Sequence, residues 1–229
     1  MGGLGFEPNV QQLMQFVPRI MVLLLCLPVH EFAHGYMAYK LGDKTAANLG
    51  RLTLNPFAHL DIFGSLLLLF AGFGWAKPVP VQPRAFSNPR RGMALVAAAG
   101  PLANIIMATL VMVFLRIISP QVTFHPAVFP RIVAFGWHDV ILQSIISINL
   151  ILAVFNMLPV PPLDGSRILY AFLPDRLYFG AMRYERFIMI GVMLLVFMGA
   201  LTGIILALSA QLYRLVVFIT QPVSMIMGG

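Results

Sequence analysis

The residues best suited to chemistry in this chain lie in the stretch HEFAH, from His30 to His34. Positions four apart share one face of an α-helix, so both imidazoles can reach one metal ion. Glu31 lies beside them, where its carboxylate can take a proton from a metal-bound water. The surrounding run from Ile20 to about Leu41 is otherwise apolar. Charged residues at membrane depth cost roughly 2.5–3.5 kcal/mol each on insertion scales, so a polar cluster here would be destabilising without a function. The cluster therefore predicts a zinc site on a membrane helix.

The overall composition is that of a membrane protein. Of 229 residues, 59% are hydrophobic and only 10% are charged, whereas a soluble domain carries about 25% charged residues. We predict an all-α polytopic membrane protein with about four to six transmembrane helices. One integral-membrane domain is expected over residues 1–229, with its core at about 18–175 and C-terminal helices over 176–229. The formal charge of +7 is attributed to loops that face one side of the bilayer, so no nucleic-acid partner is expected.

Further apolar stretches follow the first span. Three are long enough to cross a bilayer, at about 93–118, 140–157 and 187–208. The stretch 62–75 has only 14 residues, a length typical of re-entrant segments. The tail 209–229 is mixed, and its crossing is left open.

A proline-rich stretch follows the predicted re-entrant segment. Residues 77–83 read KPVPVQP. Pro78 and Pro80 remove the backbone donors on one side of an extended chain, while Val79 and Val81 keep donors on the other side. Such a short β-like edge strand could pair with an extended peptide, and a rigid loop is the equally weighted alternative.

A second group of polar residues lies in the stretch NMLPVPPLDG, from Asn156 to Gly165. Its prolines end the preceding helix, which places Asp164 on irregular backbone near the membrane edge. A catalytic zinc keeps three protein ligands and one open position. His30, His34 and Asp164 supply three such ligands, and Asn156 is a candidate donor to a tetrahedral oxyanion.

The distribution of basic residues predicts which side of the membrane the site faces. If 62–75 returns to the side it left, eleven Lys and Arg residues share the side of Lys40. The four on the other side are Arg19, Arg116, Arg131 and Arg214. This asymmetry obeys the positive-inside rule, so the active site is predicted to face the cytoplasm.

These motifs resemble the site-2 protease family of intramembrane zinc metalloproteases. HEFAH lies in a first span, GPLAN in a middle span and NMLPVPPLDG after a later one. GRLTLNP and GWAKPVPV are similar to the compact branch that lacks PDZ and CBS domains. The resemblance covers most of residues 20–175.

The resemblance implies one Zn²⁺ per chain and a set of residues that bind it and act with it. The implied zinc ligands are His30, His34 and Asp164, with Glu31 as catalytic acid/base and Asn156 as an oxyanion or substrate contact. It also implies cleavage of a transmembrane protein substrate within the lipid bilayer, near the cytosolic face. A prokaryotic cytoplasmic membrane is the expected location, and the oligomeric state is left open.

Other functions and roles remain open at this stage. One alternative is a membrane metal-binding or transport protein, which would need further ligands along a path. The other is an inactive protease-like scaffold, against which the intact Glu31 argues, because metal binding alone does not need that residue. Cys26 shares the helix face of His30, so it could be a fourth ligand or a packed small residue. The roles of His59 and Asp61 are also left open.

Overall fold

The computed structural model describes residues 16–71, 74–120, 136–174, 187–192 and 194–227, with positions 122, 124, 129, 130 and 184. Within this part of the chain, four helices are long and apolar enough to cross a membrane. They are Phe16–Lys40, Pro89–Ile118, Trp137–Met157 and Thr202–Val223. The predicted all-α polytopic fold is confirmed.

The first span contains a local distortion just before the HEFAH motif. It comprises the π-helical turn η1 (Val22–Cys26) and α2 (Leu27–Lys40). Pro28 has no N–H, so it cannot donate to the carbonyl of Leu24 as an ordinary helix would require. The N–H of Leu27 at the start of α2 donates instead to the carbonyl of Val22, and this bond closes a wider turn.

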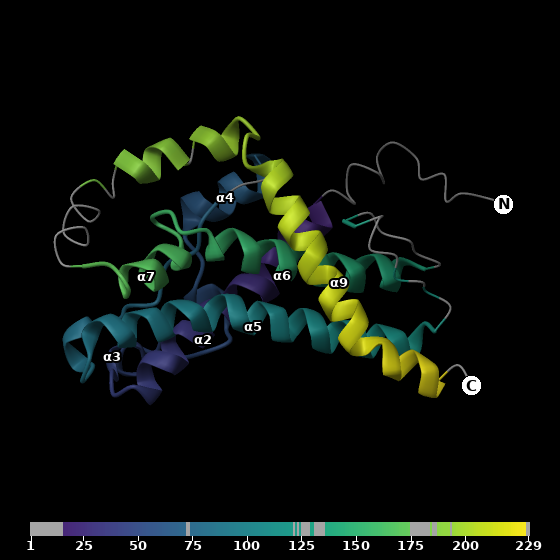
Figure 1. Ribbon diagram of the computed structural model, residues 1–229, viewed down its shortest axis with the longest axis horizontal. Helices are drawn as coiled ribbons and strands as arrows, with labels where there is room; N and C mark the ends of the chain where they lie inside the picture. Colours follow the sequence, from purple (N-terminus) through teal and green to yellow (C-terminus); the bar gives the residue numbers. More distant parts are fainter. Residues whose placement is uncertain are drawn as a thin grey trace.

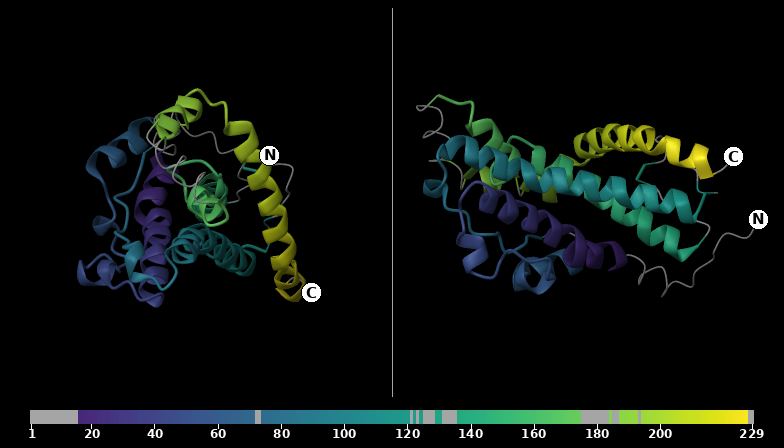
Figure 2. Two further views of the ribbon diagram at one scale, coloured as in Figure 1. Left: turned by 60° about the vertical axis from the view of Figure 1, so that its left-hand side comes forward. Right: turned by 90° about the horizontal axis from the view of Figure 1, so that it is seen from below.

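Two long helices form the centre of the molecule. α5 (Pro89–Ile118) and α6 (Trp137–Met157) pack against each other, and α2 packs along α5 (Figure 1). α9 (Thr202–Met227) contacts both α5 and α6, on the side away from α2 (Figure 2). The Asn88 side chain caps α5 by accepting from the N–H of Arg91 at 3.1 Å.

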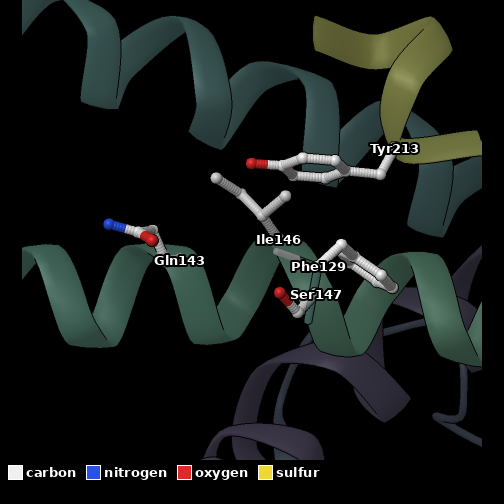
Figure 3. A pocket seen from close by; sticks show the side chains of 5 residues that line it. All are labelled: Phe129, Gln143, Ile146, Ser147 and Tyr213. Carbon is white, nitrogen blue, oxygen red and sulfur yellow. The ribbon is translucent and has the colours of Figure 1, made fainter. Parts of the chain in front are cut away.

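The larger apolar cluster, here called the distal core, lies where α5, α6 and α9 meet. Its buried members are Ala108, Met112, Leu115, Ile146, Leu150, Tyr213 and Val216. Beside it is a small pocket, in which the Tyr213 ring lies over Ile146 (Figure 3). The remaining lining residues are Phe129, Gln143 and Ser147. No candidate zinc ligand lines this pocket.

The face of α5 that points away from the bundle is strongly apolar. Leu102, Ile106, Leu110 and Phe114 recur every fourth residue, and each is at least 51% exposed. A soluble protein rarely exposes so continuous an apolar stripe. The stripe fits contact with lipid tails.

The end of the chain differs from the sequence prediction. An apolar helix, Phe187–Phe197, is followed by a turn in which Gly199 has a φ of 72°. A new helix, α9, starts at Thr202 and continues through Met227. The prediction of a single span over 187–208 is therefore wrong. Hydrophobic residues continue across the turn, so in the sequence only Gly199 indicates that the helix is interrupted there.

The short apolar stretch turns back on itself. α4 (Ile62–Ala71) leaves from Leu60, which forms an isolated antiparallel bridge with Ala76. The N–H of Lys77 also donates to the carbonyl of His59 at 2.8 Å. Because both ends of the segment lie side by side, it forms a hairpin, which is the shape that the predicted re-entrant segment requires.

Glycines let the two arms of this hairpin touch. A Cβ on Gly64 would overlap the carbonyl of Trp75, and one on Gly74 would overlap the carbonyl of Gly64. Arg19, near the start of the first span, donates to the carbonyl of Leu69 near the end of α4. A cation is favourable at a helix C-terminus, so this contact anchors the tip of the hairpin.

Residues 77–82, here called the extended segment, run extended without joining a strand in the described part of the chain. The N–H of Val79 donates to Glu31 at 2.8 Å, and that of Gln82 donates to Asp43 at 2.6 Å. The expected β-like edge strand is corrected accordingly. The N–H groups of Val79 and Gln82 pair with carboxylates from α2 and the following turn, so they do not form a ladder.

Candidate active site

The two sequence motifs meet at the end of the bundle away from the distal core. The Nε2 atom of His30 lies 3.1 Å from Oδ2 of Asp164, and Nε2 of His34 lies 3.4 Å from the same oxygen. Ligand atoms around a tetrahedral zinc, with bonds of about 2.0–2.1 Å, lie roughly 3.3 Å apart. The three side chains therefore fit a zinc ion.

The close approach of α5 to both imidazoles depends on Gly100. A Cβ at this position would lie 2.6 Å from Cε1 and Nε2 of His30, and 2.6 Å from Cε1 of His34. Any side chain here would push the rings apart or push α5 away from α2. This contact explains the glycine of the GPLAN motif.

Asp164 reaches the histidines because the chain turns sharply after α6. That helix ends at Met157, and α7 (Asp164–Tyr170) begins with Asp164 itself. A Cβ on Gly165 would overlap the Met157 carbonyl, so glycine lets α7 pack against the end of α6. The Ser166 hydroxyl donates to the Leu163 carbonyl at 2.7 Å and closes the turn.

One histidine has its orientation fixed by the backbone. Nδ1 of His34 lies 2.7 Å from the carbonyl oxygen of Val96. A carbonyl oxygen can only accept, so Nδ1 carries a proton, and Nε2, which faces Asp164, is the ring nitrogen that can bind a metal once it is unprotonated. A ring nitrogen with a free lone pair is the form that binds a metal.

The Asp164 carboxyl is held in its ionised form. Burial favours the neutral form, but hydrogen bonds from His30 and His34 outweigh burial and lower the pKa of Asp164 to about 2. The carboxylate is therefore charged at neutral pH, as metal binding requires.

Glu31 lies beside the two histidines, as the motif predicts. Its carboxylate and one ring nitrogen from each of His30 and His34 all lie within 4.8 Å of one another. The 2.8 Å bond from the Val79 N–H orients the carboxylate. Sequence reasoning missed this bond, because the pattern assigned the Val79 donor to a bound peptide.

The structure places the other two candidates differently. Asn156 lies on the last turns of α6, where one of its amide N–H groups donates to the carbonyl of Leu152 at 3.0 Å. Its role at an oxyanion stays a prediction. Cys26 is fully buried and accepts from the Asn149 amide at 3.2 Å, outside the cluster of His30 and its neighbours, as a packed residue would be.

The two polar residues whose roles the sequence left open are both bonded locally. Nε2 of the fully buried His59 lies 2.7 Å from the carbonyl of Thr53. Asp61 accepts from the N–H of Gly64 at 2.8 Å, at the start of α4. Both side chains therefore shape the approach to the hairpin.

Two charged residues that sequence reasoning missed hold the extended segment. Asp43 accepts from the backbone of Thr45 and Gln82, and Arg51 donates to the carbonyl of Lys77 at 2.8 Å. Burial opposes ionisation of Asp43, yet these hydrogen bonds lower its pKa overall. The spacing of Asp43 and Thr45 is typical of an Asx turn and could have indicated the first of them.

Comparison with known proteins establishes the family. The model of peptidase family M50 matches residues 18–199. This chain belongs to peptidase family M50. The resemblance to site-2 proteases is thereby confirmed, and the family supports a membrane-associated metalloprotease.

Several proteins similar to this chain carry names that specify zinc. "Putative zinc metalloprotease YwhC" of Bacillus subtilis is 45% identical over 156 residues, which cover 68% of each chain. "Putative zinc metalloprotease Rip2" of Mycobacterium tuberculosis is 31% identical over 66% of this chain and 55% of its own length. "Putative zinc metalloprotease MJ0611" of Methanocaldococcus jannaschii is 28% identical over 66% of this chain and 73% of its own. No solved structure gives a significant match.

Proposed function

We propose that this M50 peptidase is an intramembrane zinc metalloprotease that hydrolyses peptide bonds in or near transmembrane segments of membrane-protein substrates. One observation carries the proposal. Asp164 on α7 follows His30 and His34 on α2 by 130 or more residues in sequence. Its Oδ2 atom nevertheless lies within 3.4 Å of the Nε2 atoms of both histidines. This donor set sits at the end of a bundle of membrane-type helices.

Each residue has a distinct part in the proposed reaction. His30, His34 and Asp164 would hold one zinc ion. When bound, zinc supplies a water of lowered pKa and polarises the substrate carbonyl. Glu31 takes the proton of the attacking water and passes it to the leaving amine. The second N–H of the Asn156 amide would donate to the oxyanion as it develops.

The substrate must open before it reacts. Helical peptide bonds are shielded by their own hydrogen bonds, so the substrate helix has to unwind near the scissile bond. Gly, Asn or Pro near that bond lowers the cost of unwinding. The extended segment lies beside Glu31 and still presents the N–H of Val81, which has no partner among the described residues. An opened peptide could pair there.

A metal transporter is supported less well. Transport needs ligands along a path through the membrane. In the part of the chain described, one cluster of metal-ligating side chains is found, around His30, Glu31 and His34. A single site beside an acid/base carboxylate fits catalysis better.

The test is cleavage by the purified protein in liposomes. The substrate is a single-span reporter, in one form with a Gly-Asn pair in its helix and in a control form with Leu-Leu there. We expect zinc-dependent cleavage of the first form, abolished by a chelator and restored by Zn²⁺. Mass spectrometry of the products should place the cut within or next to the span. Cleavage that survives complete zinc removal would contradict the proposal.

We also propose that the site faces the cytoplasm. In a Cys26→Ala background, cysteines replacing the exposed Lys77 and Arg91 should react with impermeant reagent only from the cytoplasmic side. A cysteine replacing Trp137, at the opposite end of the bundle and 71% exposed, should react only from outside. Labelling of the Lys77 position from outside would overturn this orientation.

A further inference from the structure

The three helices α2, α5 and α6 carry buried polar atoms without partners on the turns next to the candidate zinc site. Nδ1 of His30, both amide atoms of Asn104 and Oδ1 of Asn149 make no hydrogen bond to any described residue. His30 is 4% exposed, and both asparagines are 0% exposed. Buried polar groups are hydrogen-bonded in nearly all proteins, so atoms of this kind point to a ligand.

The register of the helices places the residues that carry these atoms on neighbouring turns. α5 runs antiparallel to α2, because Val96 contacts His34 while Gly100 lies against both His30 and His34. Asn104 is one helical turn beyond Gly100, on the same face and therefore on the side of α2. It lies deeper in the bundle than the zinc ligands.

The third helix reaches this level independently. Cys26 is one turn before His30 on the same face of the first span. The Asn149 amide on α6 lies 3.2 Å from the Cys26 sulfur, and α6 contacts η1. Asn104 and Asn149 thus approach the underside of His30 from two helices, and we call these two residues the asparagine layer.

His30 needs an acceptor at this place. Its Nε2 faces Asp164, so a zinc-bound His30 carries its proton on Nδ1. Metal-ligating histidines almost always donate that second N–H to a carbonyl, a carboxylate or a water. His34 donates to Val96, whereas His30 has no such partner among the described residues.

We propose that one ordered water molecule lies between His30 and the asparagine layer. It accepts the Nδ1–H of His30 and is held by the amides of Asn104 and Asn149. Three polar partners are the usual number for a buried water. Asn104 and Asn149 are then positioning residues, which fix the tautomer of His30 through the water. This inference rests on the proposed zinc site.

The experiment measures zinc affinity of the full-length protein in nanodiscs by competition with a chelator. Asn104→Leu and Asn149→Leu replace each amide with an apolar side chain of similar size. The matched controls are Thr109→Val on α5 and Ser144→Ala on α6, whose hydroxyls bond only to carbonyls of their own helices. We expect each Leu variant to bind zinc about 10–100-fold more weakly and the controls to match the wild type.

If both asparagines hold the same water, a further result is expected. The double variant Asn104→Leu/Asn149→Leu should bind no more weakly than the weaker single variant, because either substitution already removes the water. Nitrogen NMR of labelled histidine should show His30 protonated at Nδ1 in the zinc-bound wild type, with that proton hydrogen-bonded. The same signal should lose its hydrogen-bond shift in the Leu variants.

Two results would overturn the inference. One is zinc affinity in both Leu variants equal to that of the controls. The other applies if a Leu variant does not fold, and it compares Asn104→Ser with Asn104→Ala. These side chains have similar volume, but only serine has a hydroxyl that could hold the water, so equal zinc affinity of the two variants would overturn the inference. Neither result contradicts the proposed function if the protein still cleaves the reporter substrate. A wild-type protein that binds no zinc would instead refute the proposed function itself.

Discussion

The two ends of the helix bundle are held together in different ways. At the site, glycines such as Gly100 and Gly165 let the helices approach closely, and hydrogen bonds between side chains and backbone groups hold neighbouring segments together. At the distal core, the same α5 and α6 pack large apolar side chains such as Met112 and Leu150 against α9. The chemistry therefore depends on close backbone approach, and much of the stability depends on distant packing.

This difference allows the two properties to be changed separately. A substitution at the site end should damage zinc binding or turnover more than folding. A substitution in the distal core should damage folding and leave zinc affinity unchanged. The following predictions test the separation, from the largest expected effect to the smallest.

Gly100→Ala should have the largest effect. Its Cβ would lie 2.6 Å from atoms of both imidazoles, so the rings must move out of their common geometry. We expect zinc affinity to fall at least ~100-fold, since a change in the ligands themselves exceeds the usual effect of their supporting residues. Gly203→Ala is the control, because a Cβ there meets nothing within 4 Å. Equal zinc affinity in the two variants would contradict the described contact.

Met112→Ala should destabilise the distal core. Met112 is fully buried, and truncation of such a side chain costs about 2–5 kcal/mol. Unfolding measured in mixed micelles should show this loss, while zinc affinity of the folded protein stays at the wild-type value. Ile106→Ala, on the exposed face of α5, should cost far less. A weakened zinc site in Met112→Ala would show that the two ends are coupled.

Asp43→Asn should loosen the extended segment. The carboxylate accepts from Gln82 and Thr45, and hydrogen bonds to charged groups contribute about 1.5–3 kcal/mol. We expect a loss of about that size at neutral pH and slower cleavage, with zinc still bound. Thr53→Val, whose hydroxyl bonds only to the nearby Asn55 N–H, is the control.

The effect of Asp43→Asn should depend on pH in a defined direction. The pKa of Asp43 is lowered in the folded protein, so its stabilisation is complete above the unfolded value of about 3.9. It is lost as the pH falls through the lower folded value. The difference in unfolding free energy between wild type and variant should therefore be constant near neutrality and shrink in acid. A difference that grows in acid would contradict the assignment.

The parts of the site set by local spacing were predictable from the sequence. Two histidines four apart must share a helix face, and the prolines before Asp164 must end α6. The length of 62–75 favoured a re-entrant segment over a full crossing, and the hairpin agrees with it. These inferences need no knowledge of which segments touch.

Contacts between distant segments were not predictable in the same way. The bond from Val79 to Glu31 joins residues 48 apart, and the role of Gly100 depends on how α5 meets α2. Hydropathy alone also could not separate the 187–197 helix from α9, because apolar residues continue through the turn at Gly199. The local pattern identified the candidate reacting groups, whereas packing between distant segments determines how they are held.

The central claim is that Glu31 acts as acid/base beside a zinc held by other residues. Glu31→Gln is nearly isosteric, and its amide oxygen can still accept from the Val79 N–H that orients Glu31. The measurement is zinc content and reporter cleavage on the same samples. We predict wild-type zinc content and a cleavage rate lower by about 10²–10⁴-fold, because no group remains to take the proton of the water. Full zinc content with near wild-type cleavage would contradict the account.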